Sequence, residues 1–326
     1  MSTTKVITII CWIVSALVLI GLAIWFLTGT IFGSWGGNWG GNWFSGINMS
    51  SFESLSGPFN SQGTQTIDTA NLHSLNINWV AGEITIVPHD GNEIHVTEFA
   101  QRDLRDNETL RVSIDGGTLT IRFRERSAIA GNMPRKNLEV LVPRELSESL
   151  TMLSVNTTSG GVSVTDFEAL TVNISSISAD VEISGVVSQS IDISAISGAI
   201  TATSIRAGRL DTDSVSGAVN ISEALATTLY VNTISGRANT RGAFDNVDVS
   251  TVSGGAIIRS STAPNRMNVS TVSGAIEVHI PNTGEITVSH SAVSGRFSSE
   301  IPVIMQSGGA YSFSSVSGNT SIFVLG

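Results

Sequence analysis

Four aspartates are placed where they could do chemistry together. Asp192, Asp211 and Asp248 each lie five residues before a recurring serine, and Asp213 follows Asp211 by two positions. Two carboxylates about 5 Å apart can share a proton, bind a cation or act on a glycosidic bond. A column of Asp and Asn on a solvated face needs no ligand at all. The solvated face is the favoured interpretation, with a cation or glycan face as the functional alternative.

Three arginines form a second candidate site. Arg122, Arg124 and Arg126 alternate with other residues, so on a strand their side chains would share one face. Such a face could contact an anionic wall polymer or lipid headgroups. A solvated strand face with Glu125 nearby is the simpler interpretation.

Composition excludes several functions. The chain has 17 basic and 27 acidic residues and a net charge of −10, which argues against nucleic-acid binding. Its single cysteine excludes a disulfide framework and CxxC sites. The sequence contains no HExxH, GxSxG, Walker or GxGxxG motif. We therefore expect no catalytic residues, no metal site, no cofactor and no enzyme activity.

The candidate residues belong to a repeat. Nine dipeptides, eight of them Ser-Gly and one Ser-Ala, recur every 18 to 23 residues. Their serines are Ser159, Ser178, Ser197, Ser216, Ser235, Ser253, Ser273, Ser294 and Ser317. Apolar and polar residues alternate on both sides, as in short strands with one buried face. Glycine at a fixed position is typical of a corner.

This pattern predicts an all-β fold, a parallel β-solenoid (β-helix) of about 19–20-residue rungs. A unit of that size cannot bury its own apolar face, so each rung should pair with the next at about 4.8 Å. Residues 151–326 should form the regular Ser-Gly repeat solenoid, and residues 64–150 irregular N-terminal rungs. Two segments in the irregular part, 79–86 and 114–121, share the Gly, x, apolar, x, apolar signature. The apolar C-terminus, 322–325, would be either an exposed strand edge or a covered strand.

The N-terminus predicts a membrane anchor. Val6 to Leu27 contains no charged residue and is long enough for one transmembrane helix, assigned to residues 6–28. A cleaved signal peptide is the competing interpretation, although its apolar stretch is normally shorter. Lys5 precedes the segment and Arg102 is the next basic residue, so residues 1–5 should be a cytoplasmic tail and the solenoid extracytoplasmic. Residues 29–63 read as a linker rich in Gly, Trp and Ser.

The repeated [Ile/Val]-Ser-Gly-x-[Val/Ile] segments behind an apolar N-terminus resemble the bacterial family DUF4097, a "putative adhesin" family of unknown function. The resemblance covers roughly Gln65 to Gly326 and includes the turn Pro88-His89-Asp90-Gly91. It implies a β-solenoid on envelope proteins and supplies no catalytic residues. Family members often carry an acidic residue after the corner glycine, whereas here only Asp180 occupies that position.

Three functions follow from the residues and the resemblance together. The first is a structural or adhesive role, in which the membrane-anchored solenoid binds cell-wall polymer, glycan or an envelope protein. The second is an envelope-stress regulatory or scaffolding module that partners a membrane sensor, since some family members lie near such regulators. The third is a polysaccharide-active enzyme that uses Asp192 and Asp211. The sequence does not indicate an oligomeric state.

Overall fold

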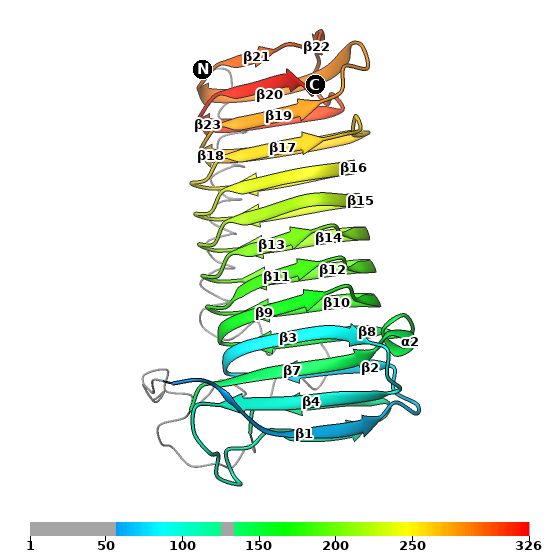
Figure 1. The fold of residues 1–326 in the computed structure, drawn as a ribbon. Coiled ribbons are helices and arrows are strands. Elements are labelled where there is room, and N and C mark those ends of the chain that lie inside the picture. Colours follow the sequence, from blue (N-terminus) through cyan, green and yellow to red (C-terminus); the bar gives the residue numbers. More distant parts are fainter. Residues whose placement is uncertain (1–56, 125–133, 326) are drawn as a thin grey trace. The chain divides into compact units, whose positions relative to one another are not determined.

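A computed structural model describes residues 57–124 and 134–325 of the chain (Figure 1). The predicted tail 1–5, the predicted membrane helix 6–28, most of the linker 29–63 and Arg126 lie outside the described residues. Within the described part, no helix has the length and hydrophobicity needed to cross a membrane. The first strand begins at Asn60, earlier than Thr64, where we expected the rungs to start.

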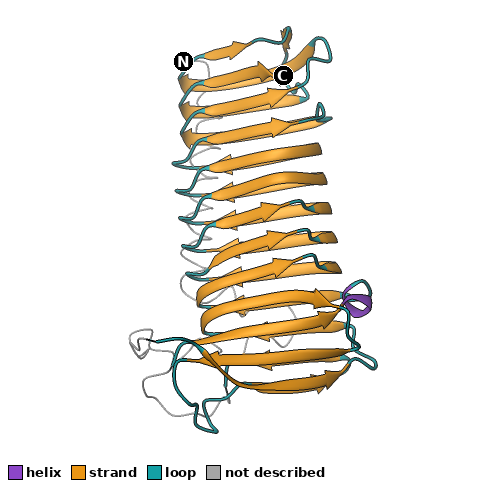
Figure 2. Ribbon diagram, viewed as in Figure 1, coloured by secondary structure: helices purple, strands orange, loops and turns teal. Residues whose placement is uncertain are grey.

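The predicted parallel β-solenoid is confirmed, and strands make up nearly all of the described regular structure (Figure 2). The short helix is α2 (Arg144–Ser147). The strands are β1 (Asn60–Asp68), β2 (Ser74–Asn78), β3 (Ala81–His89), β4 (Glu93–Ala100), β5 (Arg111–Asp115), β6 (Thr118–Arg122), β7 (Lys136–Pro143), β8 (Met152–Thr157), β9 (Ser159–Thr165), β10 (Glu168–Ser176), β11 (Asp180–Ser184), β12 (Val187–Ala195), β13 (Ile200–Thr203), β14 (Arg206–Ser214), β15 (Val219–Thr233), β16 (Ala238–Thr251), β17 (Ala256–Ser260), β18 (Arg266–Ser273), β19 (Ile276–Ile280), β20 (Ile286–Ser294), β21 (Phe297–Ser299), β22 (Val303–Met305), β23 (Tyr311–Ser317) and β24 (Thr320–Val324).

Each coil contributes strands to two stacks that meet at the Ser-Gly corner. Stack A contains the strand before each corner and runs through β8, β10, β12, β14 and the C-terminal parts of β15 and β16. Stack B contains the strand after each corner and runs through β9, β11, β13, the N-terminal parts of β15 and β16, and β17. Equivalent residues of neighbouring coils are therefore opposite each other, about 4.8 Å apart.

Apolar side chains that point inward form the core. On stack B, Val162, Val181, Ile200 and Val219 are opposite one another and buried. The alternation in the sequence predicted these ladders. The apolar residues directly before the repeat serines behave differently, because they lie at the corner and stay partly exposed. They are Ile177, Ile196, Val215, Ile234, Val252, Val272, Val293 and Val316.

The corner glycines are fixed by the contact between neighbouring coils. A Cβ atom built on Gly217 would lie 1.8 Å from the carbonyl oxygen of Gly198, and one on Gly236 would lie 1.9 Å from that of Gly217. The same close approach continues through Gly254, Gly274 and the later corners. No side chain fits at that distance, so the glycines are required by packing between coils.

A buried hydroxyl group completes most corners. Ser214 Oγ accepts a hydrogen bond from Gly217 N at 2.9 Å and donates one to Gly217 O at 3.0 Å. Ser176 makes the same pair of bonds with Ala179. The equivalent positions of later coils hold Thr233, Thr251, Thr271 and Ser315. These hydroxyls satisfy backbone groups that the tight corner would otherwise leave unpaired.

The order of coils in space departs from their order in the chain at both ends, contrary to our expectation that each rung pairs with the next. The last coil, β23–β24, pairs with β18–β19 on one side and with β20–β21 on the other. The apolar C-terminal segment is therefore a covered strand, β24 (Figure 1). At the other end, β2–β3 lies between β6–β7 and β8–β9.

The N-terminal end also contains antiparallel pairs, β1 with β4, β4 with β7, and β5 with β6. The segment 114–121 contains the turn of the hairpin β5–β6 and most of β6, which pairs in parallel with β2 as part of a rung, as its signature predicted. Gly116 and Gly117 both have positive φ, at 52° and 75°, as a two-residue hairpin turn requires. The signature therefore identified β6 but did not predict the antiparallel strand β5 before it, since glycine occurs in both corners and hairpin turns.

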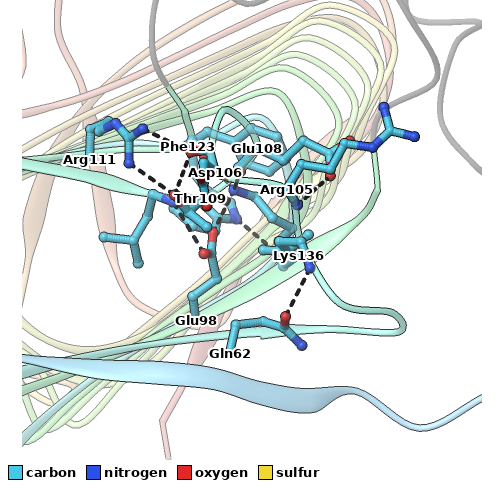
Figure 3. A network of polar contacts seen from close by, with 12 residues as sticks. Gln62, Glu98, Arg105, Asp106, Glu108, Thr109, Arg111, Phe123 and Lys136 are labelled. Atoms are coloured by element: carbon cyan, nitrogen blue, oxygen red, sulfur yellow. Dashed lines mark hydrogen bonds and ion pairs between the residues drawn. The ribbon is translucent and has the colours of Figure 1, made fainter.

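A buried lysine holds the N-terminal end together (Figure 3). Lys136 Nζ lies 2.5 Å from Glu98 Oε1, donates to Glu108 O at 2.6 Å and also donates to Phe123 O. It lies over the rings of Phe123 and Trp79, at 4.0 and 5.2 Å from their centroids. Burial lowers the pKa of Lys136 from 10.5 to about 8, so the side chain remains mainly charged at pH 7.

The loop above Lys136 is fixed by Glu108. Its carboxylate accepts two hydrogen bonds from the Arg102 guanidinium, at 2.8 and 2.9 Å, and one from Arg105 N at 2.9 Å. The hydrogen bonding from Arg102 lowers the pKa of Glu108 to about 2. This loop supplies the Glu108 carbonyl group that Lys136 needs.

Two adjacent glycines test the corner constraint. A Cβ on Gly254 would lie 1.7 Å from Gly236 O, whereas a Cβ on Gly255 would have nothing closer than Ala275 O at 3.2 Å. We expect Gly254→Ala to lower the free energy of unfolding by about 3 kcal/mol or more, and Gly255→Ala by less than about 1 kcal/mol. Urea denaturation of both variants measures the difference. Equal losses would contradict a steric origin, since Ala199 and Ala218 already occupy the position of Gly255 in other coils.

The buried ion pair gives a second prediction. Lys136→Met should lower the free energy of unfolding by about 3–5 kcal/mol, because it leaves the Glu98 carboxylate buried without its cation. The double variant Lys136→Met with Glu98→Gln should recover part of that loss, since no buried charge remains. Thermal and urea unfolding at pH 7 provide the comparison. A double variant less stable than the single one would show that the charge of Glu98 is not the cause.

Candidate functional site

The carboxylates singled out in the sequence lie on the outward face of stack A. One column there contains Asn173, Asp192, Asp211, Tyr230, Asp248 and Asn268, each opposite the next on neighbouring strands. The strand alternation that buries Ile191 and Ile193 turns Asp192 outward. The repeat therefore predicted this register correctly.

Asp192, Asp211 and Asp213 form one acidic cluster. Asp192 is directly opposite Asp211, and Asp213 lies two residues farther along the same strand, β14. Much of the surface of Asp192 is exposed, but its carboxyl group is partly desolvated among neighbouring side chains. This desolvation, followed by the charges of Asp211 and Asp213, raises the pKa of Asp192 to about 6. Desolvation likewise raises the pKa of Asp213, against a hydrogen bond from Asn232 Nδ2 at 2.9 Å.

A cation of the same strand partly compensates the cluster. Arg209, on β14, donates a short hydrogen bond to Asp211 Oδ2, and its guanidinium lies 4.0 Å from the centroid of the Tyr230 ring. The second oxygen of Asp211, Oδ1, is shielded from solvent and accepts no hydrogen bond from the described residues. The cluster thus contains one ion-paired carboxylate beside one that is easily protonated.

Asp248 lies outside this cluster. The Tyr230 ring occupies the position between Asp211 and Asp248 in the column. Asp248 instead accepts a hydrogen bond from Asn268 Nδ2 at 3.2 Å in the next coil. Of the four predicted aspartates, the fold brings three together.

The cluster favours uptake of a proton by Asp192 over metal coordination. The raised pKa of Asp192, about 6, means that this carboxyl group takes up a proton more readily than an ordinary aspartate. A metal ion needs more ligands, and within residues 57–124 and 134–325 no three His, Cys, Asp or Glu side chains converge to hold one. An outward face of a sheet can also present these oxygens to the hydroxyl groups of a glycan.

The three predicted arginines are not placed as one strand face within the described residues. Strand β6 ends at Arg122, Phe123 is buried beside Lys136, and Arg124 lies in the bend that follows. Arg126 lies outside the described residues. Arg122 and Arg124 are therefore next to the N-terminal lysine network, and the charge of Arg124 contributes to the lowered pKa of Lys136.

Sequence reasoning missed Arg209, Tyr230 and Asn232 as partners of the cluster. A signal for Arg209 was present, because it precedes Asp211 by two residues and must share its strand face. Asn232 could have been found from its 19-residue separation from Asp213, which is one coil. Tyr230 was recognised as part of the column, but its contact with Arg209 depends on side-chain conformation.

The raised pKa of Asp192 predicts a pH-dependent stability. Its value is 3.8 when unfolded and about 6 when folded, so protonated Asp192 favours the folded state. This contribution is complete below about pH 4 and is lost as the pH rises through 6. Asp192→Asn should therefore be more stable than the parent protein at pH 7 and about equally stable at pH 4.

Urea unfolding of both proteins at pH 4, 5, 6 and 7 tests this. Asp245→Asn, at an exposed position of β16, is the matched control and should show no such trend. A constant difference between Asp192→Asn and the parent protein over this range would contradict the prediction.

Comparison with solved structures supports the fold. A crystal structure of a "putative lipid binding protein" from Parabacteroides distasonis is similar over 79% of this chain and 96% of its own, with 15% identity and a TM-score of 0.52. Crystal structures of a "putative adhesin" from Bacteroides fragilis and another from Parabacteroides distasonis have 13% and 14% identity and TM-scores of 0.44 and 0.45. They cover 83% and 82% of this chain and 98% of their own. At these identities the similarity concerns the fold alone.

Comparison of sequences gives the family. No curated protein sequence matches the chain. A family model, described as Toastrack DUF4097, matches residues 72–322, which include all nine Ser-Gly corners. The chain therefore belongs to the Toastrack family, DUF4097.

Proposed function

We propose that this protein is a binding scaffold of the bacterial cell envelope, tethered to the membrane through residues 6–28 with its solenoid outside the cytoplasm. The observation that carries the proposal is the regular outward surface of stacks A and B. Polar side chains repeat there at every coil, in register, along rigid parallel strands. Such a surface matches extended partners whose own groups repeat, such as cell-wall polymers, glycans or elongated envelope proteins.

The mode of action follows from rigidity. A binding group on a paired strand loses little additional conformational freedom when a partner binds. Contacts repeated along the coils add up, since weak sites that are linked bind together far more strongly than each one alone. The acidic cluster is then one local feature of an extended binding surface, and the proposed role requires no catalytic step.

The membrane tether is supported by the sequence. The uncharged run of residues 6–27 and the basic Lys5 before it favour an N-terminus inside the cytoplasm. The linker of residues 29–63 would separate the solenoid from the membrane surface.

Topology labelling tests this proposal. Asn265 is exposed at the start of the coil containing β18, and its backbone N–H donates a hydrogen bond to Asp245 O at 2.7 Å. In intact cells, Asn265→Cys in the full chain should react with a membrane-impermeant maleimide. The native Cys11 lies in the predicted membrane segment and should not react.

The control is Ala202→Cys, at a fully buried position of β13, which should label only after denaturation. A separately exported protein with an exposed cysteine confirms that the reagent passes the cell wall. Labelling of Asn265→Cys only after lysis would place the solenoid in the cytoplasm and overturn the proposed function.

A further inference from the structure

Stack B contains a basic surface near its C-terminal end. Arg237 lies just before β16, Arg241 lies on β16, and Arg259 lies on the neighbouring strand β17. Glu277 and His279 on β19, and Phe323 on β24, continue it. We call these six residues the arginine face. It stands out in a chain with a net charge of −10.

The two central arginines are directly opposed. Arg241 and Arg259 occupy opposite positions on neighbouring strands, where like charges destabilise a sheet. Arg259 is compensated by Glu277, with Nη2 3.3 Å from Oε1. Arg241 is exposed, and no described residue forms a hydrogen bond or ion pair with its side chain. An anion placed between the two guanidinium groups would relieve the repulsion.

Two aromatic rings continue the column of Arg241 and Arg259. His279 is opposite Arg259, and Phe323 is opposite His279, so four coils contribute one residue each. The rings of His279 and Phe323 stack with centroids 5.0 Å apart and an interplanar angle of 25°. His279 Nε2 lies 2.6 Å from Glu277 Oε1, which fixes the imidazole. Partly exposed rings beside cations suit the apolar faces of sugar rings that carry acidic groups.

The same outward surface is acidic farther toward the N-terminus. On β11, Asp180 lies in the column of Arg237, and Glu83 on β3 lies in that same column. Glu182 lies in the column of Glu277, while Ser184 lies in the column of Arg241 and Arg259. An anionic chain would therefore be attracted to the C-terminal coils and repelled from the N-terminal ones. This change of sign limits the ligand to a segment that spans about four coils.

We propose that the arginine face binds a linear polysaccharide carrying carboxylate groups. A carboxylate pairs with Arg241 and Arg259, charge-assisted hydrogen bonds hold it, and a neighbouring sugar ring packs on Phe323. The polymer lies along the solenoid axis, crossing one strand at a time. The inference rests on the proposed binding function and names the ligand class and the site.

The test uses the full chain in detergent micelles with polygalacturonate as the probe. Arg241→Gln with Arg259→Gln removes two charges and keeps most of the side-chain volume. The matched control is Arg206→Gln with Arg266→Gln, which removes two exposed arginines from stack A. We expect the parent protein and the control to bind with similar Kd, and the Arg241/Arg259 variant to bind at least about tenfold more weakly.

Further measurements separate the effect of charge from that of ring stacking and from misfolding. Phe323→Ala should weaken polygalacturonate binding several-fold. None of the proteins should bind neutral dextran as tightly as the parent protein binds polygalacturonate. Raising the salt concentration should weaken polygalacturonate binding by the parent protein more than by the double variant. Circular dichroism melting identifies any variant that fails to fold, and Arg241→Lys should then retain part of the affinity because it keeps the charge.

Each contrary result has a distinct meaning. Undiminished binding by the Arg241/Arg259 variant overturns the site but leaves the binding scaffold in place. If the Arg241/Arg259 variant loses as much affinity for polyphosphate as for polygalacturonate, and the parent protein binds polyphosphate more tightly, the assignment of a carboxylate ligand is overturned. A change of oligomeric state in the double variant without a change in polymer affinity would make the face a contact between copies and overturn the proposal. Cytoplasmic labelling in the topology experiment would instead overturn the proposed function itself.

Discussion

The distance between successive backbones at the Ser-Gly corner constrains the whole solenoid. From Gly198 onward, each corner carbonyl oxygen lies where the Cβ of the next corner residue would be, so these coils stack closely because that residue is glycine; Ala179 is the one corner residue with a Cβ atom. Hydroxyl groups such as that of Ser214 then replace the backbone partners that the corner lacks. Because this contact recurs at every coil, it keeps the strands in register. Residues at equivalent positions of successive coils therefore form columns on stacks A and B, and both the acidic and the basic columns are a consequence of that register.

Register also explains how like charges come to be neighbours. A residue type repeated at the coil period is placed beside itself, whether or not the pairing is favourable. Asp192 and Asp211 are opposed on stack A, and Arg241 and Arg259 on stack B. The solenoid accommodates both pairs because they face solvent and have one compensating partner each, Arg209 and Glu277. The scaffold can therefore carry surfaces of opposite charge without any change in its core.

The period, the inward ladders and the aspartate column could be predicted because each depends on local alternation and a fixed spacing. The inserted position of β23–β24 could not, since its corner at Ser317 has the same local pattern as the corners at Ser273 and Ser294. The buried hydroxyl groups at the corners could not be predicted, because serine and threonine are frequent throughout the chain. Lys136 gave no signal either: its partners Glu98, Glu108 and Phe123 are joined by a loop and by antiparallel pairs that no repeat specifies.

The insertion of the last coil has a consequence for biosynthesis. A chain is made from its N-terminus, and most solenoids can add each coil to the preceding one as it leaves the ribosome. Here β18 and β19 must wait for β23 and β24, which are translated after β20 and β21. These coils therefore cannot close in the order in which they are synthesised. For the same reason, gene duplication can lengthen this solenoid by adding coils to its middle, where each coil pairs with the next, whereas a coil that followed β24 would find both sides of β24 already paired.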